Sequence, residues 1–462
     1  MVWKVMQGDV RNKLAELPEK SVQCVVTSPP YWGLRDYGLP PSVWGGDENC
    51  EHEWGKQIKE RKRGSLHGAN AQAGNTLKGV SGTELKQGQF CQKCGAWLGC
   101  LGLEPTPEMF VANLVEVFKG VWRVLRDDGV LWLNLGSSYA GSGKAGSNPE
   151  HQRRHTQFGQ KERKERLGAP MSAKAIGYKP KDLIPIPWLV AIALQKDGWC
   201  LRSDIIWHKP NPMPESVTDR PTKAHEYIFL LTKNQKYFYD ADAIREPLSE
   251  QRAAQAGQHI DPGNIASKRR EQIEHDKARG SGGHFDGHKW KMNPLGRNKH
   301  SVWTVATQPY PEAHFATFPP RLITPMVLAG TSPKACEKCG APWERVVEKE
   351  KVGYKEYKNR KKVGLCGKDR DDGGLIMSKG HTGRYDVAST TTGWQPTCSC
   401  ENEGTGRCVV LDPFAGSGTT LHVAEHYGRD SIGIELNPEY VKLIEKRMDN
   451  FQQTIFSLGV GV

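Results

Sequence analysis

Val25-Val26-Thr27-Ser28-Pro29-Pro30-Tyr31-Trp32 is the stretch around which the rest of the chain is organised. Its β-branched run predicts a strand, which stops at Ser28 and two prolines. Pro29 and Pro30 have no N–H and a fixed φ, so they cannot continue a ladder and they leave backbone carbonyls unpaired. The stretch therefore predicts a strand end that carries a polar site beside the ring of Tyr31. A Ser-Pro-Pro triplet alone is equally consistent with an ordinary strand-to-turn junction.

Unpaired acceptors beside an aromatic ring suit a reaction at a planar amino group. The amine of a nucleobase is a poor nucleophile because its lone pair is delocalised into the ring. Acceptors that hydrogen-bond both amino hydrogens, with Tyr31 stacked on the base, would hold the lone pair toward an electrophile.

A second stretch, residues 409–420 near the other end, reads Val-Val-Leu-Asp-Pro-Phe-Ala-Gly-Ser-Gly-Thr-Thr. An apolar strand runs into a glycine turn, a helical stretch follows through Tyr427, and a second strand over 431–434 precedes Glu435. This is the order of a nucleotide-binding βαβ unit, in which an acid about 20 residues after the first strand binds ribose hydroxyls. Asp412 and Glu435 are 23 residues apart, which fits this spacing.

Together the two stretches resemble the amino-methyltransferases of DNA, which carry an S/D/N-P-P-Y/F motif and an F-x-G-x-G loop and use S-adenosylmethionine. The S-P-P-Y motif comes first here, as in the β class of that family. The resemblance covers residues 1–55, 101–240 and 301–450. It implies a doubly wound, Rossmann-like α/β sheet assembled from both ends of the chain. It also implies methyl transfer to the exocyclic amine of a base flipped out of double-stranded DNA.

The resemblance assigns roles to individual residues. Ser28 and the carbonyl of Pro29 would orient the amine, and Tyr31 would stack on the base. The implied catalytic residues are Ser28, Pro29, Pro30 and Tyr31. The implied cofactor-binding residues are Asp9, Asp412, Phe414, Ala415, Gly416, Gly418, Thr419 and Glu435. Asp9 is included because the family places an acid after its first strand, near the adenine end of the cofactor.

The same resemblance favours cytosine N4 over adenine N6 as the methylated amine. Family members with Ser at the place of Ser28 more often act on cytosine, whereas Asp goes with adenine. A hydroxyl can donate and accept hydrogen bonds, while an ionised Asp only accepts them. Adenine N6 methylation is the main alternative. An RNA or protein methyltransferase and a non-catalytic zinc-containing DNA-binding protein are further alternatives.

Cytosine C5 methylation is disfavoured by the cysteines of the chain. That reaction needs an activated cysteine nucleophile, typically in a Pro-Cys pair. No Pro-Cys dipeptide occurs in the sequence.

The cysteine pattern instead predicts two structural zinc sites. The phrase Cys-x-x-Cys-Gly-Ala, followed by Trp, occurs at 91–97 and again at 336–343. Such a knuckle places two thiolates on one ion. Further donors complete two predicted sets, which are Cys50, His52, Cys91 and Cys94, and Cys336, Cys339, Cys398 and Cys400. Cys100 could replace one ligand of the first set, and a redox dithiol or unligated thiols are the alternative at both places.

Composition sets the remaining limits. The chain has 462 residues and 37% hydrophobic content, enough for one large or two ordinary domains. No apolar run approaches 18 residues and no signal peptide is evident, so we expect a cytoplasmic protein without a membrane partner. Its net charge of +12 is concentrated at 151–181 and 251–300, which suits the phosphates of double-stranded DNA. The oligomeric state, the recognition sequence and a restriction enzyme as partner are left open.

Composition shifts divide the chain into seven segments. Residues 1–46, 103–240, 301–335 and 404–462 are expected to form the methyltransferase domain, with a basic loop over 136–181. Residues 47–102 and 336–403 are expected to be zinc-ribbon-like insertions, and 241–300 a target-recognition segment.

Periodicity predicts the main elements. Helices are expected over 10–17, 106–125, 185–194 and 321–329, and strands over 2–6, 22–26, 130–135, 199–207, 226–232, 236–240 and 301–307. Asp127-Asp128-Gly129 is expected to end the second helix.

Overall fold

The computed structural model describes residues 3–33, 39–56, 88–140, 176–247, 296–308, 318–351 and 387–457. The chain forms two compact units. One consists of residues 1–240, 300–343 and 396–462, and the other of residues 241–299 and 344–395.

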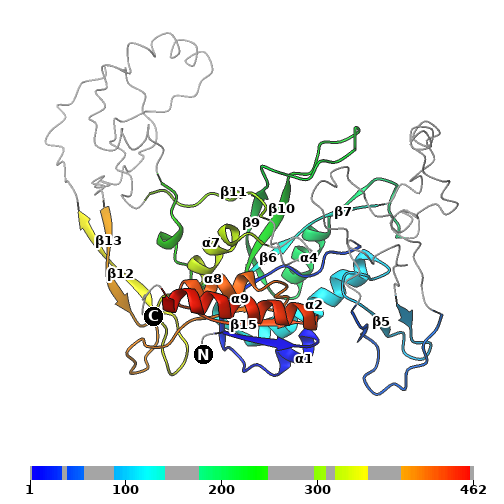
Figure 1. The fold of residues 1–462 in the computed structure, drawn as a ribbon, viewed down its shortest axis with the longest axis horizontal. Coiled ribbons are helices and arrows are strands. Elements are labelled where there is room, and N and C mark those ends of the chain that lie inside the picture. Colours follow the sequence, from blue (N-terminus) through cyan, green and yellow to red (C-terminus); the bar gives the residue numbers. More distant parts are fainter. Residues whose placement is uncertain are drawn as a thin grey trace, which may run out of the picture. The chain divides into compact units, whose positions relative to one another are not determined.

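The first unit is built on an eight-stranded sheet (Figure 1). In spatial order its strands are β1 (Trp3–Gln7), β15 (Asp430–Glu435), β14 (Val409–Asp412), β2 (Val22–Thr27), β6 (Leu125–Leu135), β10 (His225–Thr232), β9 (Cys200–His208) and β11 (Val302–Thr304). The five strands from β1 to β6 are parallel. β10 is antiparallel to both of its neighbours, and β11 is parallel to β9.

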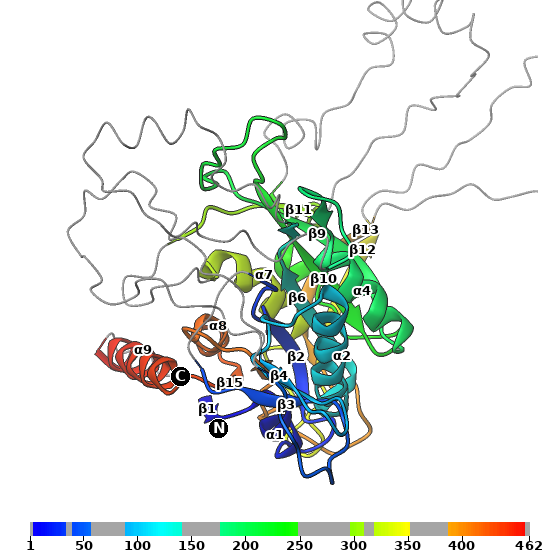
Figure 2. The same ribbon diagram turned by 90° about the vertical axis from the view of Figure 1, so that its right-hand side faces the viewer.

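Helices cover both faces of this sheet (Figure 2). One layer contains α1 (Val10–Ala15), α2 (Pro107–Val124) and α4 (Ile186–Lys196). The opposite layer contains α7 (Pro320–Gly330), α8 (Thr419–His426) and α9 (Pro438–Ser457). The doubly wound α/β fold predicted from the sequence is therefore confirmed.

α2 shows how the sequence fixes one of these layers. Thr106 caps the helix by accepting a hydrogen bond from Met109 N at 3.3 Å, and proline occupies the first turn. Phe110, Leu114 and Val117 recur at helical spacing and are fully buried. Burial of each large apolar side chain stabilises the fold by about 1.5–3 kcal/mol.

The two ends of the chain meet at the centre of the sheet. β14 pairs with β2, at Val410 with Cys24 and at Leu411 with Val25. From this pair the chain continues to β15 on one side and to β6 on the other. The boundary between β14 and β2 is therefore a topological switch point, where ligands bind outside the carboxyl ends of the strands.

Smaller sheets surround this core. β3 (Ser42–Trp44), β5 (Trp97–Gly99) and β4 (Gln89–Phe90) form a three-stranded sheet, and β7 (Ser138–Tyr139) pairs with β8 (Leu183–Ile184). In the second unit, β12 (Glu344–Lys351) pairs with β13 (Val387–Gln395), and η1 (Asp242–Ile244) precedes a bridge between Glu246 and Arg297. No helix in the described parts of the chain combines the length and the apolar character needed to cross a membrane.

Two local predictions are wrong. Residues 236–240 do not form a strand, because their N–H groups bind separate partners and not one neighbouring ladder: Phe238 N donates to Asp128 O, and Asp240 N to Ala329 O. Residues 127–129 do not end a helix either. α2 already ends at Val124, and 127–129 belong to β6, whose partners are buried strands.

Parts of four other predictions lie outside the described residues. These parts are 141–175 of the basic loop, 248–295 of the recognition segment, 57–87 of the first insertion and 352–386 of the second.

Candidate active site

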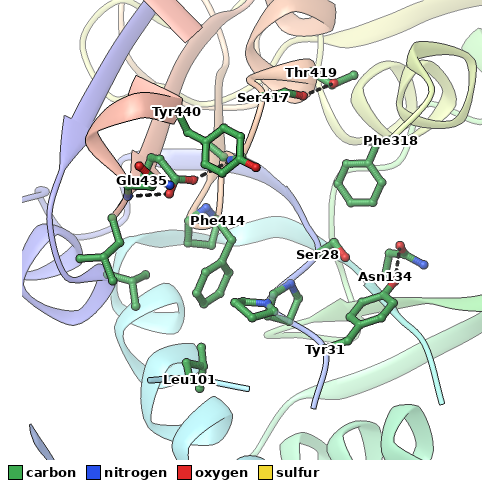
Figure 3. Close-up of a pocket in the computed structure, with 18 of the residues that line it drawn as sticks. Ser28, Tyr31, Leu101, Asn134, Phe318, Phe414, Ser417, Thr419, Glu435 and Tyr440 are labelled. Atoms are coloured by element: carbon green, nitrogen blue, oxygen red, sulfur yellow. Dashed lines mark hydrogen bonds between the residues drawn. The ribbon is translucent and has the colours of Figure 1, made fainter. Parts of the chain in front are cut away.

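A cavity of about 820 Å³ lies at the carboxyl ends of β2 and β14 (Figure 3). Residues 28–31, which follow β2, line one part of it, and residues 413–417 with Thr419, which follow β14, line another. Asp9, just after β1, and Glu435, at the end of β15, line it as well. The structure thus brings together motifs from opposite ends of the sequence.

Two residues predicted to bind cofactor are not among those that line the cavity. The Asp412 carboxylate is fully buried and accepts hydrogen bonds from Thr27 Oγ1 (2.7 Å), Thr420 Oγ1 (2.7 Å) and Phe414 N (3.1 Å). Burial raises the pKa of Asp412 to about 6, against the opposing effect of these donors. Through these bonds the Asp412 carboxylate fixes the position of the glycine loop, residues 413–418.

Gly418 has a packing role in the same loop. Its φ is +74°, which disfavours any side chain, and a Cβ there would lie 3.0 Å from the Ile444 side chain. Gly418 lets the first turn of α8 approach α9 closely.

Glu435 places a hydrogen-bond acceptor on one side of the cavity. Its carboxylate accepts hydrogen bonds from Gly416 N and Asn437 N, both at 2.8 Å. Burial raises the pKa of Glu435 to about 7, although these backbone donors act in the opposite direction. Phe414 and Tyr440 lie beside it (Figure 3). A fixed carboxylate beside aromatic rings can receive the hydroxyls and the base of a nucleoside.

Asp9, which also lines the cavity, is paired with Arg11. It caps α1 by accepting from Arg11 N, and its carboxylate forms an ion pair with Arg11 Nη2 at 3.0 Å. Burial alone would raise the pKa of Asp9, but the hydrogen bonds and charge of Arg11 outweigh it and hold the pKa below its usual value.

The opposite side of the cavity contains a polar network that the sequence did not reveal. The hydroxyl of Tyr31 donates to Glu226 Oε2 at 2.7 Å and lies 3.0 Å from Asn134 Oδ1. Lys209 forms an ion pair with Glu226, and Asn134 Nδ2 donates to Tyr227 O at 3.0 Å. All three of Asn134, Lys209 and Glu226 line the cavity. The one signal in the sequence was Asn134 itself, a polar residue inside an apolar strand.

The ring of Tyr31 lies close to the backbone of Gly136. A Cβ on Gly136 would lie 2.6 Å from Tyr31 Cε2, so no other residue fits there without moving the ring. In the view of Figure 3, Phe318 and Tyr31 lie on either side of Ser28. Phe318 lines the cavity as well.

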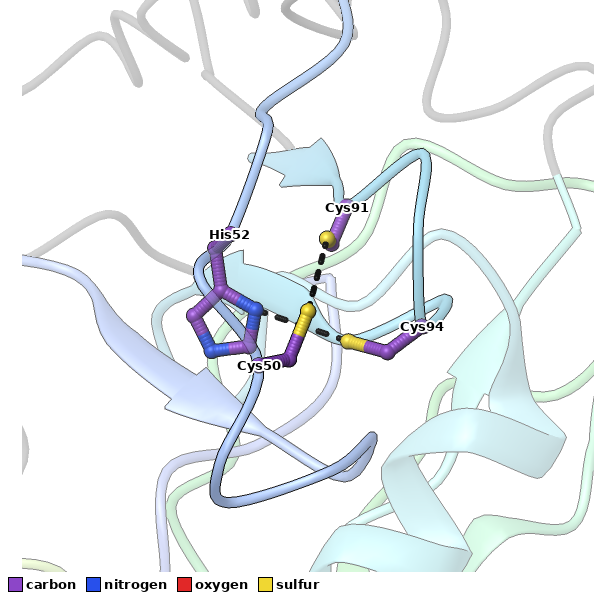
Figure 4. A group of neighbouring side chains, drawn as sticks. All are labelled: Cys50, His52, Cys91 and Cys94. Atoms are coloured by element: carbon purple, nitrogen blue, oxygen red, sulfur yellow. Dashed lines mark hydrogen bonds between the residues drawn. The ribbon is translucent and has the colours of Figure 1, made fainter.

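The predicted metal ligands form two clusters. The histidine-containing cluster is Cys50, His52, Cys91 and Cys94 (Figure 4), and the four-cysteine cluster is Cys336, Cys339, Cys398 and Cys400. In each cluster the potential ligand atoms all lie within 4.8 Å of one another. Cys100 is not part of the first cluster, and its Sγ donates to Leu39 O at 3.3 Å. Both clusters could bind zinc, which favours four such donors.

The repeated cysteine phrase corresponds to a repeated backbone turn. Cys91 N donates to Ala96 O at 2.8 Å, and Cys336 N donates to Ala341 O at 2.9 Å. The glycine after each second cysteine has a positive φ, +75° at Gly95 and +68° at Gly340. The two insertions therefore share one knuckle geometry.

Comparison with known proteins agrees with this site. The model of a DNA methylase family for N6 and N4 methyltransferases matches residues 22–337 and 399–446. Type II methyltransferase M.XycI of Xanthomonas campestris pv. cyanopsidis is 31% identical over 457 residues, which cover 99% of this chain and 91% of that protein. Type II methyltransferase M.Cfr9I of Citrobacter freundii is 32% identical over 457 residues, with the same coverage of 99% and 91%.

A solved structure, that of the cytosine-N4-specific PvuII DNA methyltransferase, covers 98% of this chain and 92% of that chain, at 14% identity and a TM-score of 0.41. Its similarity is too low for details to be transferred. The family model and the two relatives, by contrast, each match most of the chain, and the protein therefore belongs to the DNA methylase family of N6 and N4 methyltransferases.

Proposed function

We propose that this protein transfers a methyl group from S-adenosylmethionine to N4 of a cytosine flipped out of double-stranded DNA. One observation carries the proposal: the S-P-P-Y and F-A-G-S-G motifs line a single cavity at the switch point of the sheet. A ligand at such a point contacts residues from both halves of the chain.

The half of the cavity around β14 and β15 suits the cofactor. S-adenosylmethionine supplies an electrophilic methyl group when it is bound. The Glu435 carboxylate is fixed by two backbone N–H groups and can accept from ribose hydroxyls. Phe414 and Tyr440 offer aromatic faces in the same half.

The half of the cavity around β2 suits the base. Ser28 and the carbonyl of Pro29 would accept from the amino hydrogens and so direct the lone pair of the amine. Tyr31 would stack on the base, a contact worth about 1–3 kcal/mol. Its hydroxyl is anchored by Glu226, so the ring has little freedom to lose when the base enters.

Ser28 is compatible with cytosine as the target base. Its hydroxyl can accept from the amine and also donate to the ring nitrogen beside it, whereas an Asp at this place would only accept. The resemblance of the Ser-Pro-Pro-Tyr motif to cytosine-N4 enzymes supports the same choice. Adenine N6 presents an amine beside a ring nitrogen too, and it is the alternative product.

DNA is the proposed substrate, and a base must leave the duplex to reach this cavity. The net charge of +12 favours binding of the phosphate backbone. The two relatives named above, which match nearly the whole chain, are Type II methyltransferases.

The proposal is tested by methyl transfer from radiolabelled S-adenosylmethionine to unmodified bacterial genomic DNA. Wild type should label the DNA, and Tyr31→Ala should label it much more slowly, as a loss of about 1–3 kcal/mol of stacking implies. Tyr237→Ala, which changes a tyrosine outside the cavity, is the matched control and should retain activity. Wild-type protein that binds the cofactor yet labels no DNA would contradict the proposal.

A further inference from the structure

The geometry of the histidine-containing cluster fits one zinc ion. Two sulfurs bound to the same tetrahedral zinc at about 2.3 Å lie about 3.8 Å apart. Cys50 Sγ and Cys91 Sγ are 3.9 Å apart, and Cys94 Sγ lies 3.4 Å from His52 Nδ1 (Figure 4). Segments 50–52 and 91–94 each supply two donors, so an ion here would tie the two segments together.

These two segments continue directly into one wall of the cavity. Cavity-lining residues occur within 39–44, just before Cys50, and within 100–103, just after β5. β3 pairs with β5, so that Trp44 lies opposite Trp97. This sheet has strands of only two or three residues, too short to be stable without further support. We call the lining parts of 39–44 and 100–103 the insertion wall.

The knuckle also packs closely on the start of the insertion. A Cβ on Gly46 would lie 2.9 Å from Cys94 Sγ and 2.5 Å from Ala96 Cβ. The ligand turn is therefore in direct contact with the loop that follows Trp44, a residue of the insertion wall.

The insertion wall is fastened to the cofactor half of the cavity by one arginine. Arg11 Nη1 donates to Val43 O at 2.8 Å, and the Arg11 guanidinium lies 3.8 Å from the Trp44 ring centroid. Arg11 also forms the ion pair with Asp9, which lines the cavity after β1. Movement of the insertion wall would therefore disturb the surroundings of Asp9.

The four-cysteine cluster lies near the amino ends of β2 and β6, whereas the cavity lies at the carboxyl ends of the strands. Gly340 O accepts from Gln23 Nε2, and Cys339 O from Arg126 Nη1, both at 2.6 Å. Gln23 is near the start of β2, whereas Ser28 follows the end of that strand. Five residues of extended chain separate the two places by roughly 16 Å.

We infer that the histidine-containing cluster binds a zinc ion that holds the insertion wall in place, and that affinity for S-adenosylmethionine depends on this zinc and not on the zinc of the four-cysteine cluster. This inference rests on the proposed function, since it takes the cavity as the cofactor site. It assigns to one of two similar metal sites a role in ligand binding.

The repeated knuckle offers a matched pair of variants. Cys94→Ser and Cys339→Ser change the same position of the Cys-x-x-Cys-Gly-Ala phrase in the two clusters. Metal analysis should find two zinc ions in wild type and one in each variant. Calorimetry should show affinity for S-adenosylmethionine lowered by about tenfold or more in Cys94→Ser, because a preformed wall is lost. It should show no change in Cys339→Ser.

A second measurement covers the case in which Cys94→Ser does not fold. In Cys339→Ser protein, the zinc that remains is that of the histidine-containing cluster. Removal of this zinc by a chelator should lower cofactor affinity, and added zinc should restore it. Equal cofactor affinity with and without this zinc would overturn the inference alone. Wild type with two zinc ions but no affinity for S-adenosylmethionine would overturn the proposed function together with it.

Discussion

Thr27 Oγ1 donates a 2.7 Å hydrogen bond to Asp412 Oδ1 between the two central strands of the sheet. Thr27 directly precedes the S-P-P-Y motif, and Asp412 lies two residues before the F-A-G-S-G motif. Both partners are buried, so this bond fixes the relative position of the two loops that we propose bind the base and the cofactor. The catalytic arrangement thus depends on a contact between opposite ends of the chain.

Asp412→Ala should therefore lower the free energy of unfolding of the protein. It would leave Thr27, Thr420 and Phe414 N without their buried acceptor, at about 1–3 kcal/mol for each unsatisfied group. Urea unfolding gives the free energy of unfolding directly. Asp219→Ala, which breaks an exposed ion pair with Lys181, is the control and should change it by less than about 1 kcal/mol. Similar losses in the two variants would disprove the role given to Asp412.

Tyr31→Ala should reduce methyl transfer more than Ser28→Ala. Some contacts to the amine come from backbone carbonyls, which survive a change of the Ser28 side chain, whereas the stacking face of Tyr31 has no replacement. Its loss should weaken base binding by about 1–3 kcal/mol. Single-turnover rates of the two variants provide the measurement, and a Tyr31→Ala rate equal to that of wild type would eliminate stacking by this ring.

Glu226 should act as a positioning residue through the hydroxyl of Tyr31. Tyr31→Phe and Glu226→Ala each remove the same 2.7 Å hydrogen bond, so their effects on kcat/KM for DNA should be less than additive in the double variant. Affinity for S-adenosylmethionine should stay unchanged in both. Fully additive effects would show that Glu226 acts independently of the ring.

Glu435 should make both stability and cofactor affinity depend on pH. Its pKa rises from 4.5 to about 7 in the folded protein, so the folded state binds more protons than the unfolded state between these values. The contribution of Glu435 to stability is thus present below pH 4.5 and is lost as the pH rises through about 7. The stability difference between Glu435→Gln and wild type should shift in favour of the variant over this range.

Cofactor affinity should show the opposite trend. An ionised carboxylate is the stronger acceptor for ribose hydroxyls, so wild type should bind S-adenosylmethionine more tightly above pH 7 than below it. Calorimetry on both sides of this pH checks the trend, with Glu435→Gln expected to show little pH dependence. Parallel pH profiles of the two proteins would argue against contact between Glu435 and the cofactor.

The sequence predicted the fold and the two motifs because both rest on local patterns. Apolar runs gave β2, β14 and β15, and proline or glycine marked where each strand ends. The two clusters of predicted zinc ligands were also predictable in part, since each Cys-x-x-Cys knuckle is encoded within four residues. Asn134, Lys209 and Glu226 were missed because they approach Tyr31 only through the pairing of β6, β10 and β9.

Some predicted roles depend on side-chain direction, which spacing does not encode. Asp412 ends the first strand of the predicted nucleotide-binding unit and was predicted to bind the cofactor, yet its carboxylate turns under the loop toward Thr27. Residues 236–240 have the composition of a strand but no neighbouring strand to pair with among the described residues. Both cases were decided by tertiary contacts and not by local sequence.

The account as a whole is tested most directly by mass spectrometry of nucleosides from DNA that the protein has methylated. The methyl donor should be S-adenosylmethionine, and the product should be N4-methylcytosine, formed much more slowly by Tyr31→Ala than by wild type. N6-methyladenine without N4-methylcytosine would contradict the choice of base while leaving the cavity and its cofactor intact. A 5-methylcytosine product, or none, would contradict the assignment of the Ser-Pro-Pro-Tyr site itself.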